Sequence, residues 1–188
     1  MKSKLSNAVC YLSDSMEASK DWGMGWRKRF TEKAKSAGLN LVVLNPADKP
    51  AGLMKEGKDD WAEVRRSKDY PKIASYVKQI RRVDLRMVDL SDFLVVMVDK
   101  NVHACGTYDE TFTAEDQHKP IFVICEGGLD NLPQWLFDVV NFEEVFDSDD
   151  ALIKHLVDLD SGAVALDDRW VLIRDYLKGQ FNAVTEAE

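Results

Sequence analysis

The sequence predicts an α/β protein with three layers, in which helices cover both faces of a doubly wound, five-stranded parallel sheet of flavodoxin or Rossmann type. Apolar runs of strand length alternate with amphipathic segments of helix length along the chain. With 188 residues and 45% hydrophobic residues, the chain is long enough to form one hydrophobic core. We expect one domain over residues 1–160 and a helical extension over residues 161–188 that packs on it.

Five apolar runs are predicted to be strands, because each is short, rich in β-branched or aromatic residues and followed by polar or turn-forming residues. The runs cover residues 7–12, 41–44, 93–98, 121–125 and 144–146. In an open parallel sheet, ligands bind outside the carboxyl ends of the strands. The polar residues that follow these runs are therefore the first place to look for a site.

The segments between these runs are predicted to be helical. They cover residues 25–37, 71–88, 132–140, 148–160 and 167–177, and a further helix follows the Gly106-Thr107 turn and presents Glu110 in its first turn. In the first of them, Trp26, Phe30 and Ala34 recur every four residues, which is the apolar stripe of an amphipathic helix, and Gly38 is a typical stop. The segment from 49 to 71 mixes Gly, Pro and many charges, and we expect a surface excursion with a helical turn around 61–66.

Composition excludes several classes of function. With 25 Lys and Arg against 33 Asp and Glu, the net charge is −8, so we expect neither polymeric nucleic acid nor a membrane as partner. The N-terminus lacks a secretion signal, and the apolar runs are too short to span a membrane, which favours a cytoplasmic protein. Glycine-rich phosphate loops are absent, and the three Cys and three His lack the spacing of metal ligands. We therefore expect no metal and no organic cofactor.

Glu110 lies in the turn after the third predicted strand, and two interpretations of it compete. The run Thr107-Tyr108-Asp109-Glu110 fits a capping box, in which Thr107 caps a helix and Glu110 bonds back to the backbone. Alternatively, the positive end of the helix dipole holds Glu110 ionised, as a nucleophile that points into a pocket. The local pattern alone is compatible with both.

Several segments together favour the nucleophile. The runs YLSDSMEASKDWGMGWRKRF, LNP, DLRMVDLSDFLVVMVD and CGTYDETFTAEDQHKPIFVI occur in an order and spacing that resembles the nucleoside 2-deoxyribosyltransferase family, in particular its phage and prokaryotic branch. The resemblance covers about residues 9–123. It implies that Glu110 attacks the anomeric carbon of a nucleoside, that Tyr11 holds this nucleophile, and that Asp84 is the second acidic group of the site. The implied reaction is a double displacement through a covalent glycosyl-enzyme intermediate.

The resemblance also implies a small-molecule nucleoside or nucleotide as partner and a homo-oligomer in which neighbouring subunits complete each site. We expect further substrate contacts from residues at strand ends and in the adjoining turns. They are Ser13, Asp14, Trp26, Arg27, Asn45, Asp99, Gly106 and Thr107. Plainer interpretations stay open for three residues: Tyr11 as an ordinary strand aromatic, Asp84 as a solvated residue at a helix end, and Arg27 as a surface arginine.

Two departures from the family pattern affect the expected chemistry. Family members have an Asp six residues before the nucleophile that contacts the nucleobase, and here that position is Ala104. Another base, another sugar or hydrolysis is therefore expected instead of the usual base exchange. Asp14 replaces a small residue in the loop after the first strand, and its charge would repel a phosphate. The alternatives are an N-glycosidase that uses water and a non-catalytic nucleotide-binding module in which Glu110 is only a cap.

Overall fold

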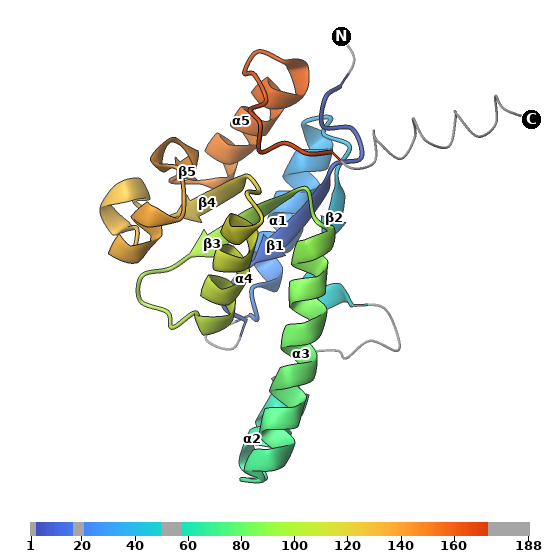
Figure 1. Ribbon diagram of the computed structural model, residues 1–188, viewed down its shortest axis with the longest axis vertical. Coiled ribbons are helices and arrows are strands. Elements are labelled where there is room, and N and C mark those ends of the chain that lie inside the picture. Colours follow the sequence, from blue (N-terminus) through green and yellow to red (C-terminus); the bar gives the residue numbers. More distant parts are fainter. Residues whose placement is uncertain (1–2, 17–20, 50–57, 173–188) are drawn as a thin grey trace, which may run out of the picture.

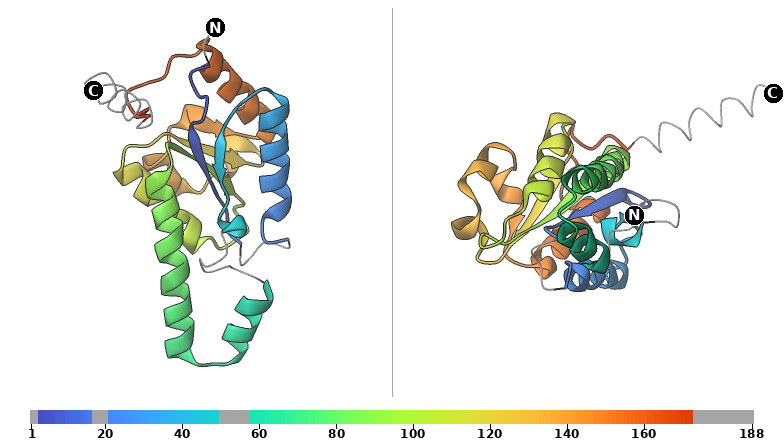
Figure 2. Two further views of the ribbon diagram at one scale, coloured as in Figure 1. Left: turned by 90° about the vertical axis from the view of Figure 1, so that its right-hand side faces the viewer. Right: turned by 90° about the horizontal axis from the view of Figure 1, so that it is seen from below.

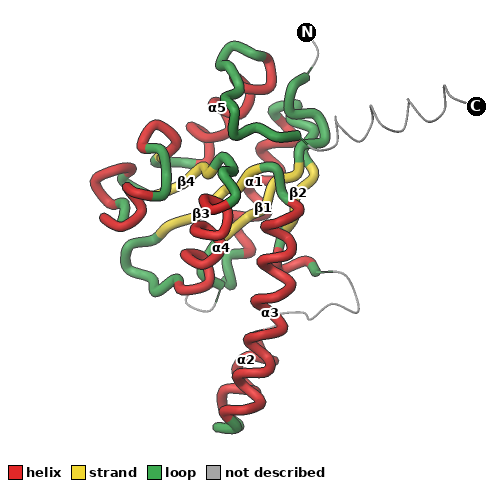
Figure 3. The backbone as a smooth tube through the Cα atoms, viewed as in Figure 1, coloured by secondary structure: helices red, strands yellow, loops and turns green. Residues whose placement is uncertain are grey.

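The computed structural model describes residues 3–16, 21–49 and 58–172, and it confirms the predicted parallel sheet. The strands are β1 (Val9–Ser13), β2 (Val42–Leu44), β3 (Phe93–Val98), β4 (Ile121–Cys125) and β5 (Val145–Phe146). All neighbouring strands pair in parallel, in the order β2-β1-β3-β4-β5 (Figures 1 and 3). The chain leaves β1 for one edge of the sheet and returns to β3 on the other side. A ligand crevice is expected at that reversal, between the carboxyl ends of β1 and β3.

Helices cover both faces of the sheet, as predicted (Figures 1 and 2). On one face lie α1 (Met24–Ser36) and α5 (Asp149–Ser161), and on the other lie α3 (Tyr70–Leu90) and α4 (Cys105–Asp116). Side chains alternate along each strand, so Leu12 packs under α1 and α5, whereas Tyr11 faces α3 and α4. Tyr11 therefore points to the face on which the helix carrying Glu110 lies.

A helical hairpin projects from the body of the domain where the sequence predicted a surface excursion. It consists of α2 (Lys58–Arg66) and the first part of α3, and Figure 2 shows it extending beyond the sheet. Within the hairpin, α2 packs against α3 through a small apolar cluster of Val64, Ile73, Tyr76 and Ile80. The part of the excursion at 50–57 lies outside the described residues. No helix in the described ranges is long and apolar enough to cross a membrane.

Two predicted helices differ from the structure. The segment 132–140 forms only a 3-10 turn, Gln134–Asp138, and Pro133 precedes this turn instead of lying in the first turn of a helix. Further 3-10 turns are Pro46–Asp48, Gly128–Asn131 and Phe142–Glu144. Residues 167–172 of the predicted last helix are not helical. Trp170 instead packs against Phe93 of the core, with ring centroids 5.3 Å apart, and this contact sets the path of the chain. The remainder of that prediction, including most of the extension at 161–188, lies outside the described residues.

Asp149 in the first turn of α5 ties this helix to α1, and its charge should stabilise the fold. Its carboxylate lies 2.6 Å from Nε of Arg29 and 2.9 Å from Nζ of Lys33. Burial by itself would raise the pKa of Asp149, but the hydrogen bonds and charges of Lys33 and Arg29 outweigh it and lower this pKa below its usual value. A lowered pKa contributes stability above the unfolded-state value of about 4, and this contribution is lost as the pH falls through the folded-state value.

We expect Asp149→Asn to lower the free energy of unfolding at pH 7 by about 1 kcal/mol, because both cations are partly exposed. Thermal unfolding between pH 7 and pH 3 should show the variant and the wild type converging in acid. Asp150→Asn is the matched control, since Asp150 also contacts Lys33 but its side chain is 76% exposed. A deficit of Asp149→Asn that persists unchanged at pH 3 would contradict the electrostatic explanation.

Candidate active site

A cavity of about 480 Å³ opens at the carboxyl end of β1, between α3 and the first turns of α4. Its wall includes Asp84 from α3, Gly106, Thr107 and Glu110 from α4, and Asp14 from the loop after β1. Five of the residues predicted from the sequence therefore lie around one cavity. The cavity is at the reversal of strand order, which is the place where this class of sheet binds ligands.

The carboxylate of Glu110 is held by two hydroxyl groups of β1. Tyr11 Oη donates a hydrogen bond to Oε1 over 2.8 Å, and Ser13 Oγ donates one to Oε2. Tyr11 and Ser13 are two residues apart in one strand, so both side chains point to the same face. Burial raises the pKa of Tyr11 well above its usual value, and the charges of Glu110 and Asp84 raise it further. Tyr11 is therefore protonated near neutral pH and remains a hydrogen-bond donor.

The capping-box interpretation of Glu110 is wrong. α4 begins at Cys105, before the Gly-Thr pair after which the sequence predicted it, and Ala104 precedes it without a side-chain cap. Thr107 is thus inside the first turn, where it is buried, and Glu110 lies in the second turn. From that turn the carboxylate reaches the hydroxyl groups of β1 instead of returning to the backbone of its own helix.

Asp84 is not a solvated residue at a helix end, because it lies two turns before the end of α3 and is 7% exposed. One of its carboxylate oxygens, Oδ1, is 2.7 Å from Nζ of Lys49, whose side chain is fully buried. Sequence reasoning missed Lys49. It is a single lysine in a loop rich in Pro and charges, and no local pattern distinguishes it from a surface residue.

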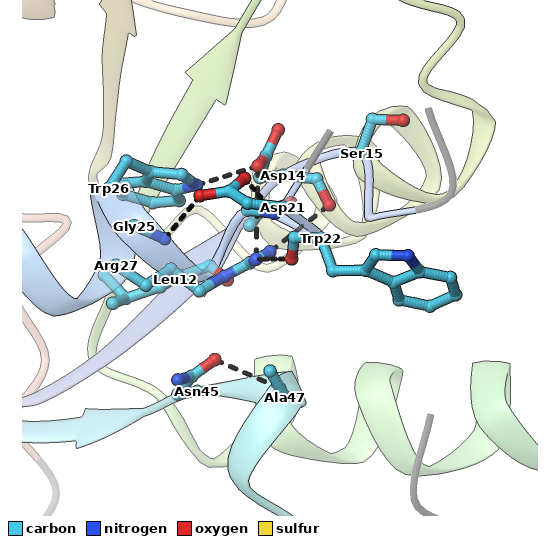
Figure 4. A network of polar contacts seen from close by, with 12 residues as sticks. Leu12, Asp14, Ser15, Asp21, Trp22, Gly25, Trp26, Arg27, Asn45 and Ala47 are labelled. Carbon is cyan, nitrogen blue, oxygen red and sulfur yellow. Dashed lines mark hydrogen bonds and ion pairs between the residues drawn. The ribbon is translucent and has the colours of Figure 1, made fainter. Parts of the chain in front are cut away.

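Arg27 is not a surface arginine either, since it is 1% exposed at the start of α1. Its guanidinium donates hydrogen bonds to three backbone carbonyls, those of Leu12 at 3.3 Å, Trp22 at 3.0 Å and Asp14 at 3.3 Å (Figure 4). These contacts fold the loop between β1 and α1 around the arginine. Arg27 thereby fixes the loop that forms one wall of the cavity.

Asp14 and Trp26 belong to the same loop structure. The indole Nε1 of Trp26 donates a hydrogen bond to Oδ2 of Asp14 over 2.8 Å, and Nη1 of Arg27 is 4.0 Å from the same oxygen (Figure 4). Burial raises the pKa of Asp14, although Arg27 and Trp26 oppose this. Gly23 has a φ of +66°, and a Cβ there would collide with both Asp14 and Arg27. This glycine allows the loop to close tightly on the two charges.

Asn45 and Asp99, like Trp26 and Arg27, do not reach the wall of this cavity. Asn45 accepts a hydrogen bond from the backbone N–H of Ala47, 3.0 Å away, and so starts a 3-10 turn after β2. Asp99 accepts one from the backbone N–H of Asn101 at 2.9 Å in the loop after β3. It borders a second cleft, which Trp26 and Asp14 also line.

Sequence reasoning also missed part of the cavity wall. His103 and Cys105 line it beside Ala104, with Nε2 and Sγ 3.2 Å apart. Arg81 of α3 lines it as well, but its guanidinium contacts Asp109 at 2.6 and 2.9 Å. Among the described residues, no group of three or more His, Cys, Asp or Glu is placed to hold a metal ion.

Comparison with known proteins supports this fold. No family model and no curated protein matches the sequence. Among solved structures, a 2-deoxyribosyltransferase from the psychrotolerant bacterium Bacillus psychrosaccharolyticus superimposes with a TM-score of 0.50 and 13% identity, over 78% of this chain and 96% of that one. The chain shares its fold with that 2-deoxyribosyltransferase. A conserved protein from Enterococcus faecalis V583 matches at 16% identity and a TM-score of 0.46, over 85% of this chain and 100% of that one.

Proposed function

We propose that the protein cleaves or exchanges the N-glycosidic bond of a nucleoside, with Glu110 as the nucleophile. The observation that carries this proposal is the placement of the Glu110 carboxylate, which lines the cavity while Tyr11 and Ser13 each donate a hydrogen bond to it. These contacts orient the two oxygens and favour the ionised form. The fold shared with a 2-deoxyribosyltransferase supports the same chemistry.

In the first step, an oxygen of Glu110 forms a bond to the anomeric carbon while the bond from that carbon to the base nitrogen breaks. The electron pair of the broken bond leaves with the base, which takes up a proton. Positive charge develops on the sugar in the transition state, and a carboxylate next to the anomeric carbon stabilises it. In the second step, a free base or a water molecule bonds to the anomeric carbon and gives up a proton to solvent water, while the bond from that carbon to Glu110 breaks and the carboxylate is regenerated. The two inversions restore the original configuration.

The charges of the cavity favour a nucleoside over a nucleotide. Among the described residues, its wall carries four carboxyl groups, those of Asp14, Asp84, Asp109 and Glu110. The cation of Arg81 on this wall already contacts Asp109 through two hydrogen bonds. A phosphate would therefore enter against like charges, whereas the hydroxyl groups of a neutral sugar can donate hydrogen bonds to the carboxylates.

The two residues that flank Ala104 in the sequence, His103 and Cys105, line the cavity and bear on the choice of base and acceptor. Ala104 offers no carboxylate to a nucleobase, and the neighbouring polar groups on the wall are those of His103 and Cys105. We expect these two side chains to meet the base in place of an acidic contact. Weaker retention of a free base would favour water as the acceptor, so hydrolysis is the second candidate function.

The homo-oligomer that the family resemblance implies stays a prediction.

An assay of products tests the proposal. The protein is incubated with a panel of deoxynucleosides, ribonucleosides and their 5′-monophosphates, with and without free bases, and the products are separated by chromatography. New nucleosides that depend on an added base would establish transfer, and released base without new nucleosides would establish hydrolysis. We expect each nucleoside to react at least about tenfold faster than its monophosphate, because the wall is anionic. Saturable binding without either product at high protein concentration would contradict the proposal.

A further inference from the structure

A buried lysine supports the cavity from behind Asp84. Lys49 follows the 3-10 turn after β2, and this turn delivers its side chain to the side of α3 that carries Asp84. The Lys49 side chain is 0% exposed and does not line the cavity, whereas Asp84 does. The ammonium therefore contacts Asp84 without reaching a ligand in the cavity.

Other carboxyl groups lie near Asp84, so the ionisation of Asp84 depends on the nearby cation of Lys49. Glu110 and Asp109 of α4 line the same cavity, and the hydroxyl group of Tyr11 from β1 is close enough for the charge of Asp84 to act on it. His103 of the loop before α4 is on the same wall, and Arg81 of α3 contacts Asp109. Two carboxylates in one cavity repel each other, so each ionises more readily when it has its own cation. For Asp84, Lys49 provides that cation at 2.7 Å.

We propose that Lys49 is a positioning residue that keeps the Asp84 carboxylate ionised, so that Asp84 accepts hydrogen bonds from the ligand instead of donating the proton to the leaving base. This inference deepens the proposed function and rests on it only for its consequence in turnover. A carboxylate that stays ionised in the working pH range cannot act as a general acid. The proton for the departing base then comes from water or from another group on the wall.

The burial of the pair agrees with a positioning role. Withdrawing a lysine ammonium from water is unfavourable, and an ion pair inside a protein is weak evidence for stability by itself. A surface salt bridge would hold Asp84 less firmly, because water screens it and both side chains move. The buried position of Lys49 therefore gives the carboxylate a cationic partner at a fixed place.

The first test reads the ionisation of Asp84 directly in the wild-type protein. The protein is labelled with ¹³C at Asp carboxyl groups, its spectrum is followed with pH, and Asp84→Asn identifies the signal. We expect the wild-type signal of Asp84 to titrate with a midpoint below the value of about 3.9 of an unperturbed Asp. A midpoint at or above that value would overturn the proposal. This measurement needs no turnover, so it stands even if the proposed function fails.

The second test changes the cation. In Lys49→Met the midpoint of Asp84 should rise by about one to three pH units, because the nearby positive charge is gone. Lys49→Arg should give a midpoint close to that of the wild type. Lys78 is an exposed lysine of α3, the helix that carries Asp84, and Lys78→Met should leave the midpoint unchanged. An equal midpoint in Lys49→Met and in the wild type would overturn the proposal. If Lys49→Met does not fold, the wild-type titration and Lys49→Arg still decide it.

The third test measures the pH dependence of kcat/KM with a substrate that the protein turns over. The acid limb of the pH profile of kcat/KM should move to higher pH in Lys49→Met, and Asp84→Asn combined with Lys49→Met should show no such movement, because the titrating group is absent. A purely structural role of Lys49 would lower the amount of folded protein without shifting this limb. An unshifted limb in folded Lys49→Met would therefore overturn the proposal even where the site is active.

Discussion

Replacing Glu110 with Ala is expected to abolish turnover while the protein stays folded. The side chain of Glu110 is only half-buried and borders the cavity, so its removal leaves no large void in the core. The hydroxyl groups of Tyr11 and Ser13 lose their partner, but water can take the place of the carboxylate, because Glu110 itself borders the cavity. The chemistry has no substitute nucleophile at the anomeric carbon, so the rate of product formation should fall to background. Circular dichroism and thermal unfolding check the fold.

Glu115→Ala is the matched control for this variant. Glu115 is an exposed carboxylate near the end of the same helix, outside the cavity wall, and its loss should leave the rate unchanged. Full activity of Glu110→Ala would remove Glu110 from the mechanism. Loss of activity in both variants would point to damage to α4 instead of loss of the nucleophile.

Replacing Tyr11 with Phe is expected to lower kcat by about 10² to 10³ with a much smaller effect on KM. The 2.8 Å hydrogen bond from Tyr11 orients the nucleophile and favours its ionised form, and losing one preorganised donor in an active site has an effect of this size. The ring itself is 0% exposed in the core, so Phe keeps the packing and removes only the hydroxyl group. Steady-state kinetics between pH 4 and pH 9 measure the change. The acid limb should move to higher pH.

Two controls separate this effect from a change of packing. Tyr108→Phe removes a hydroxyl from a half-buried tyrosine of α4 that stacks on Phe112, outside the cavity wall, and should leave kcat unchanged. Ser13→Ala removes the other donor to Glu110 and should lower kcat in the same direction. Unchanged kinetics in both Tyr11→Phe and Ser13→Ala would contradict the idea that these hydroxyl groups position the nucleophile.

Much of the sheet follows from local sequence. β3 and β4 coincide with their predicted bounds, because a continuous run of apolar residues is typical of a strand buried on both faces. The segment 167–172 shows the limit of this approach. Its pattern predicts a helix, but the packing of Trp170 on Phe93 and Phe122 draws the chain into an irregular path. Tertiary contacts of this kind are not encoded in a local pattern.

The residues of the site also differ in how far the sequence predicts them. Glu110, Asp84 and Tyr11 could be placed together because the resemblance to the nucleoside 2-deoxyribosyltransferase family implies that they share one site. Lys49 could not, because its role depends on a contact with a residue 35 positions further along the chain. The start of α4 was also misplaced. Thr107 has the chemistry of a helix cap, yet the backbone turns into the helix two residues earlier, at Cys105.

A covalent bond between the sugar and Glu110 is the intermediate of the proposed reaction, and mass spectrometry of the quenched and digested protein can detect it. The wild-type protein is mixed with a reactive nucleoside in the absence of free base, quenched in acid within milliseconds to seconds, and digested. We expect a mass increase of one glycosyl group that maps to the peptide containing Glu110 and is absent from Glu110→Ala. Turnover without any such adduct at any time point, or an adduct on another residue, would contradict it.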